Sequence, residues 1–72
     1  MKNINTIAEE LNVKVKTVKE IFVEAKRISY ATKHFYKTLL IYLDRIGKNN
    51  ENVNQNKLKL YDYACEYVLT QH

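Results

Sequence analysis

The sequence predicts a small all-α protein: a three- to four-helix bundle with an N-terminal helix-turn-helix, a longer third helix and a C-terminal helix. Three observations support this fold class. The chain has no proline and a single glycine, 46% of its residues are hydrophobic, and apolar residues recur at helical spacing. Seventy-two residues are enough for one domain, which we place over residues 1–72.

The first helix is expected over residues 4–11, where Ile4, Ile7, Ala8 and Leu11 share one face. Asn3, Asn5 or Thr6 could cap its beginning. Asn12 follows at the bend, and asparagine tolerates the left-handed backbone that a tight turn needs. Two short helices joined in this way form a helix-turn-helix, which we place over residues 4–25.

The second helix should begin at Val15 and end near Val23 or slightly beyond, burying Val18, Ile21 and Phe22. A long third helix is expected over residues 28–46, with Ser29 or Thr32 available as its cap. No strong helix breaker separates the second and third helices.

Residues 47–56 are expected to form a surface loop, because six of these ten residues are Asn or Gln and the segment opens with Gly47. Gly47 would end the third helix in the left-handed conformation. The C-terminal helix should then run over residues 57–70, again with two apolar lines along it.

The third helix carries two apolar stripes, so it should be buried on both sides by the fourth helix, a partner chain or both. A small core without a disulfide, since Cys65 is the single cysteine, favours a homodimer. The alternative is that these helices only complete the core of a monomer. The residues expected at a symmetric dimer interface are Phe35, Tyr36, Leu39, Leu40, Tyr42, Leu43, Tyr61 and Val68.

The net charge of +4 is confined to the N-terminal half of the chain. Residues 1–37 hold eight Lys/Arg and four Glu, whereas residues 38–72 hold four residues of each sign. This asymmetry indicates a surface for nucleic acid, the alternative being an ordinary lysine-rich helical surface. The longest strongly apolar run, residues 39–43, is far shorter than the ~20 residues of a membrane span. The N-terminus lacks the apolar region of a signal peptide, so a soluble cytoplasmic protein is expected.

Residues 7–21 read IAEELNVKVKTVKEI and resemble the helix-turn-helix of bacterial transcription regulators of the lac repressor and LuxR types. The resemblance extends over residues 4–23 only. Two positions depart from the pattern. Asn12 replaces the usual turn glycine, and Lys14 replaces the serine that commonly caps the recognition helix. Lysine beside the amides of a helix N-terminus makes a good anion site, so Lys14 is a candidate phosphate contact.

The resemblance implies that the second helix enters the major groove of DNA. The residues that would then face base edges are Val15, Lys16, Lys19 and Glu20, and those that would hold phosphates are Lys14, Thr17, Lys26 and Arg27. Glu20 could instead pair with Lys16 or Lys19 on the helix surface.

The sequence contains no constellation that indicates catalysis, a metal or a cofactor, and we expect neither an enzyme nor a small-molecule ligand. We expect sequence-specific binding of double-stranded DNA by a small dimeric transcriptional regulator, or a DNA-organising factor, of a phage or plasmid. Its two recognition helices would enter half-sites about 34–36 Å apart. The alternative function is a protein-interaction module, an adaptor or inhibitor that uses its Tyr-rich helices while the helix-turn-helix is structural.

Overall fold

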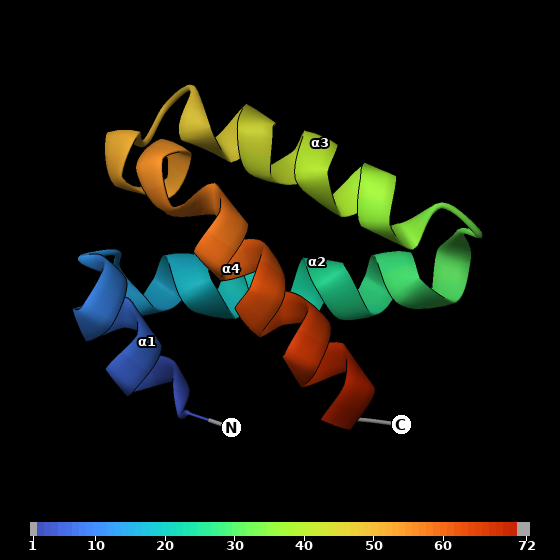
Figure 1. The fold of residues 1–72 in the computed structure, drawn as a ribbon, viewed down its shortest axis with the longest axis horizontal. Helices are drawn as coiled ribbons and strands as arrows, with labels where there is room; N and C mark the ends of the chain where they lie inside the picture. The colour runs from blue at the N-terminus through green and yellow to red at the C-terminus, as the bar shows by residue number, and fades with distance from the viewer. Residues whose placement is uncertain (1, 71–72) are drawn as a thin grey trace.

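The computed structural model describes residues 2–70 and contains four helices: α1 Ile4–Leu11, α2 Val15–Ala31, α3 Phe35–Gly47 and α4 Glu51–Thr70 (Figure 1). No strand occurs among these residues. The all-α fold class is confirmed. None of the helices in residues 2–70 is both long enough and apolar enough to cross a membrane.

The long helix α2 lies at the centre of the arrangement. In Figure 1 it runs horizontally, α4 crosses in front of it, α3 lies along the upper edge and α1 lies at the lower left. Helix α4 packs on both α2 and α3, and α1 packs on α2. The largest fully buried side chains come from all four helices: Phe22, Ile7, Ile21, Leu39, Leu43, Leu60, Val18 and Val53.

The bounds expected for α1 are confirmed, and local interactions explain both ends. Asn3 caps the helix, because its Oδ1 accepts a hydrogen bond from the Thr6 backbone N–H at 2.8 Å. Asn12 ends it in the left-handed conformation, with φ 53° and ψ 47°. Of the three caps that the sequence offered, the structure uses Asn3.

The prediction that a third helix spans residues 28–46 is wrong, because α2 continues to Ala31. Ala25 and Ile28 are buried on the face that also carries the earlier core residues of α2, so packing extends the helix. Ser29 lies inside this helix, where its hydroxyl donates to the Lys26 carbonyl at 2.7 Å instead of capping a new one.

Helix α2 ends at Ala31, because the next residue, Thr32, has an extended backbone. The Thr32 Oγ1 accepts a hydrogen bond from the His34 backbone N–H at 3.1 Å, a local bond that competes with helix continuation. Helix α3 therefore begins at Phe35 and has 13 residues, which makes it shorter than α2 with 17 and α4 with 20.

The predicted Asn-rich loop is also wrong over most of its length, since α4 begins at Glu51. The Asn50 Oδ1 accepts from the Val53 backbone N–H at 3.3 Å, and Val53 is fully buried, so a cap and a core residue start the helix early. Asn56 has non-helical dihedrals (φ −108°, ψ 15°) and kinks α4. The predicted start at Lys57 coincides with this kink.

Gly47 does not adopt the left-handed conformation expected of it. It is the last residue of α3 and is buried. A Cβ atom at Gly47 would lie 3.0 Å from the Asn54 Cα atom. Because glycine has no Cβ atom, the end of α3 can lie this close to the start of α4.

Much of the predicted dimer interface lies inside one chain. Leu39 and Leu43 are fully buried and Val68 is 6% exposed, so these three residues belong to the monomer core and cannot form a dimer surface. Helix α3 packs on both α2 and α4, which buries Leu39 and Leu43 within the chain. Of the remaining predicted residues, Phe35, Tyr42 and Tyr61 are half-buried against the core, Leu40 is partly buried, and Tyr36 is exposed.

Candidate nucleic-acid interface

A tight turn of three residues sets the direction of α2 relative to α1. The backbone N–H of Asn12 donates to the Glu9 carbonyl at 3.3 Å, and that of Val13 donates to the Ala8 carbonyl at 2.9 Å. Val13 is 8% exposed and joins the core beside Leu11. The left-handed backbone of Asn12 turns the chain away from α1. The two backbone hydrogen bonds and the burial of Val13 fix this turn against the end of α1.

Two asparagines of α4 reach across to this turn. Asn52 Nδ2 donates to the Asn12 carbonyl at 2.8 Å, and Asn56 Nδ2 donates to the Leu11 carbonyl at 3.2 Å. Carbonyls at the end of a helix lack partners in their own helix, and these side chains supply them. Asn56 Nδ2 also lies 3.0 Å from the carbonyl of Asn52, which links the two donors.

Sequence reasoning missed these positioning residues because it assigned residues 47–56 to a loop. The available signal was the spacing of Asn52 and Asn56, four residues apart. That spacing puts two amide side chains on one side of a helix. The Asn-rich segment therefore braces the turn that precedes α2.

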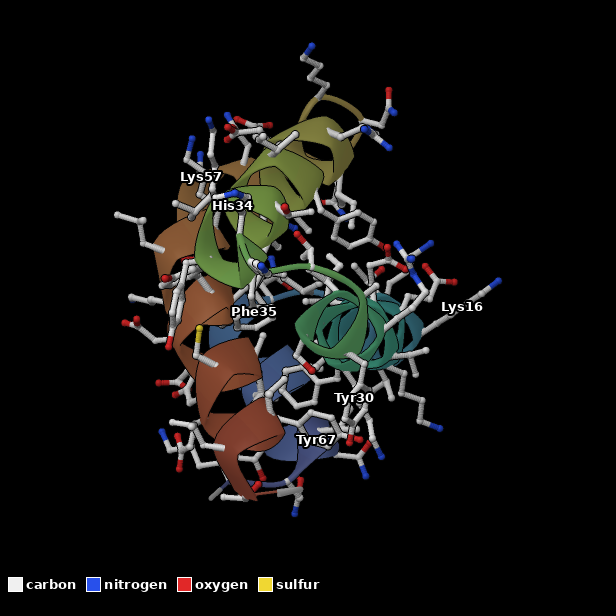
Figure 2. All side chains as sticks on the ribbon, turned by 90° about the vertical axis from the view of Figure 1, so that its right-hand side faces the viewer. Lys16, Tyr30, His34, Phe35, Lys57 and Tyr67 are labelled. Atoms are coloured by element: carbon white, nitrogen blue, oxygen red, sulfur yellow. The ribbon has the colours of Figure 1, made fainter. Side chains whose placement is uncertain are left out.

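Helix α2 buries one side and leaves the other open. Figure 2 shows Lys16 pointing from the side of α2 that lies away from α4. Lys16, Lys19, Val23 and Arg27 recur at helical spacing along this side, and all four are exposed. We call these four residues the α2 face. Val23 is 66% exposed, an apolar residue between charged ones that sequence reasoning did not single out.

The predicted base-facing residues differ in their exposure to solvent. Lys16, Lys19 and Glu20 are exposed, whereas Val15 is half-buried against the core. Val15 is therefore the least available of the four.

Among the predicted phosphate contacts, Lys14 is exposed and immediately precedes α2, with an extended backbone and no side-chain cap hydrogen bond. Its carbonyl accepts the first bond of the helix, from the Val18 N–H at 3.1 Å. Thr17 and Lys26 are half-buried, and Arg27 is exposed.

Acidic residues lie on the edge of α2 that borders α3. Burial, followed by the nearby carboxylates of Glu24 and Glu20, raises the pKa of Tyr42 on α3, which places both carboxylates near that helix. Arg27 pairs with Glu24, its Nε lying 3.1 Å from Oε1, and this hydrogen bond lowers the pKa of Glu24. None of the ion pairs within residues 2–70 includes Glu20, so pairing with Lys16 or Lys19 is not seen.

The part of the chain that the structure describes contains no pocket and no group of three or more His, Cys, Asp or Glu residues placed to hold a metal ion. Cys65 is partly buried, and this burial raises the pKa of its thiol. No protein-family model, curated protein or solved structure matches this chain.

Proposed function

We propose that this protein binds double-stranded DNA through a helix-turn-helix formed by α1 and α2, with α2 in the major groove, and acts as a transcriptional regulator or a DNA-organising factor. The observation that carries the proposal is the open α2 face directly after a left-handed turn. Lys16 and Lys19 lie on its first turns, where a recognition helix contacts base edges. Either ammonium group can donate to the O6 and N7 atoms of guanine.

The length of α2 suits this role. Its 17 residues span about 25 Å, roughly twice the width of the major groove. The N-terminal half can therefore lie in the groove while Arg27, further along, reaches the sugar-phosphate backbone. Lys14 and the free amides of the first turn offer a second phosphate site at the other end.

Preorganisation supports the same proposal. The turn bonds and the braces from Asn52 and Asn56 hold α2 against α1 without a ligand. A recognition helix that is already positioned loses little conformational entropy when it binds.

The test is fluorescence anisotropy with mixed-sequence duplex DNA over a range of salt concentrations. Wild type should show a steep salt dependence, about 0.9 in the slope of log K against log salt for each phosphate contact. The Lys16→Ala, Lys19→Ala double variant should bind more weakly at every salt concentration, because it removes both proposed base contacts. The control is Lys37→Ala, Lys48→Ala, which removes the same charge from exposed positions outside α2 and should retain affinity.

Far-UV circular dichroism establishes that both double variants are folded. A wild-type protein that does not bind duplex DNA at low salt would refute the proposal and favour the protein-interaction module. Equal losses in the two double variants would refute the assignment to α2, since only net charge would then matter.

A further inference from the structure

One side of α4 carries an apolar line that the rest of the described chain covers only in part. Leu58, Tyr61, Cys65 and Leu69 recur at helical spacing, and we call these four residues the α4 seam. Leu58 is 65% exposed and Leu69 is 71% exposed, while Tyr61 and Cys65 are partly exposed. Tyr36 of α3 extends the line, with its ring centroid 6.1 Å from that of Tyr61 and 58% of its surface exposed.

Charged residues beside the α4 seam are separated by sign along the helix. Lys57 and Lys59 precede Asp62 and Glu66, so the segment beside Leu58 is basic and the segment that follows it is acidic. Lys57 is already paired within the chain, its Nζ lying 2.6 Å from an Asp44 carboxylate oxygen. No ion pair within 4 Å involves Lys59, Asp62 or Glu66 in residues 2–70, although Lys59 lies near enough to Glu10 of α1 to help lower the pKa of that carboxyl.

This charge distribution on one α4 complements that on a second α4 when the two helices are antiparallel. Lys59 and Glu66 are seven residues apart, about two turns, and therefore lie on the same flank of the helix. When a second α4 runs antiparallel, the same flanks become neighbours, and Lys59 of one copy faces Glu66 of the other. A two-fold axis repeats this pair, as a symmetric dimer requires.

We propose that the α4 seam binds a second copy of this chain, with the two α4 helices antiparallel. Leu58 of one copy then packs beside Leu69 of the other, and two symmetry-related Lys59–Glu66 pairs lie along one side of the apolar contact. Of the residues expected at a dimer interface, this one keeps Tyr61 and Tyr36. It adds Leu58, Cys65 and Leu69 in place of those that form the monomer core.

The placement of α4 determines what such a dimer does with DNA, a step that rests on the proposed function. Helix α4 crosses one side of α2, and Lys16 points from the other side (Figures 1 and 2). Pairing through α4 therefore turns the two α2 faces outward, in opposite directions. The dimer would hold two DNA segments, one on each side, instead of reading adjacent half-sites on a single duplex.

Sedimentation equilibrium tests the interface without DNA. Wild type should dimerise, and Leu58→Ser, Leu69→Ser should be monomeric at the same concentrations. Ile41→Ser, which changes an exposed apolar residue of α3, should leave the dimer intact. All these positions are exposed, so the variants should fold, as circular dichroism would verify.

A charge exchange tests the orientation. Lys59→Glu and Glu66→Lys should each raise the dimer dissociation constant at least about tenfold, and the double variant should restore it. A wild-type protein that stays monomeric up to roughly 1 mM would overturn the inference and leave the α4 seam to a different protein. A dimer that survives both serine substitutions would also overturn it.

Bridging is measured by capture of a fluorescent duplex on beads that carry a second, immobilised duplex. Wild type should retain the fluorescent duplex. The Leu58→Ser, Leu69→Ser variant should bind a single duplex but lose capture. A dimer that binds no DNA would refute the proposed function alone, whereas a dimer that binds DNA but captures no second duplex would overturn the outward arrangement.

Discussion

The left-handed conformation of Asn12 can be tested by two substitutions with opposite expected effects. Asn12 is exposed, and its backbone has φ 53° and ψ 47°, so a change of side chain there acts mainly through backbone preference. A left-handed backbone costs an ordinary L-residue about 1–2 kcal/mol, and asparagine less. Asn12→Ala should therefore lower the free energy of unfolding by about 1 kcal/mol. Asn12→Gly should leave it unchanged or raise it by a few tenths of a kcal/mol, because relief of strain opposes the greater entropy of the unfolded chain.

Urea unfolding followed by far-UV circular dichroism measures these differences. For a domain this small, a slope of about 1 kcal/mol per M converts the loss in Asn12→Ala into a fall of about 1 M in the midpoint. The melting temperature should fall by roughly 4–8 °C. The control is Asn5→Ala, the same substitution at an exposed position within α1, which should be neutral or stabilising because alanine favours a right-handed helix.

An Asn12→Ala variant as stable as wild type would refute the left-handed turn. So would an Asn12→Gly variant destabilised as much as the alanine variant, since glycine adopts this conformation freely.

Three further predictions concern the brace, the core and pH. Asn56→Ala removes the donor to the Leu11 carbonyl and should lower the free energy of unfolding by about 1–2 kcal/mol in urea titrations. Leu39→Ala empties a fully buried site and should cost about 2–5 kcal/mol in the same titrations, whereas Ile41→Ala, at an exposed position of α3 outside both proposed surfaces, should stay within about 0.5 kcal/mol of wild type. The hydrogen bond from the Tyr63 hydroxyl, 2.5 Å long, is the main cause that lowers the pKa of Glu10, so its contribution to stability is present above the unfolded-state value of 4.5 and is lost as pH falls through the folded-state pKa. The stability gap between wild type and Glu10→Gln should therefore close on acidification.

Each of these three predictions can be contradicted by a specific result. A fully stable Asn56→Ala would mean that the α4 amides do not brace the turn, and a Leu39→Ala variant as stable as wild type would contradict the burial of Leu39. A gap for Glu10→Gln that widens in acid would reverse the sign of the linkage.

The fold class, the bounds of α1 and the turn between α1 and α2 followed from the sequence because short-range interactions decide them. The cap of α1 involves residues three apart, Asn3 and Thr6. The turn depends on the tolerance of one residue, Asn12, for a left-handed backbone. The exposure of Lys16 and Lys19 follows from helical periodicity alone once α2 begins at Val15.

Elsewhere, contacts between distant residues overrode local preference. Residues 51–56 include three asparagines, which disfavour helix interiors, yet burial of Val53 and the bonds from Asn52 and Asn56 to the end of α1 make the segment part of α4. These partners lie 40 and 45 residues apart in the chain, beyond the reach of any local pattern.

The sequence by itself determined an all-α chain, a left-handed turn at Asn12 and a basic side on the helix that follows it. Periodicity, capping and backbone preference act within a few residues, so they can be read without the fold. Only the tertiary structure decided which apolar faces are shared within one chain. It assigned Leu39 and Leu43 to the core and left Leu58 and Leu69 on the surface, because an apolar stripe does not specify what it packs against until every helix is in place.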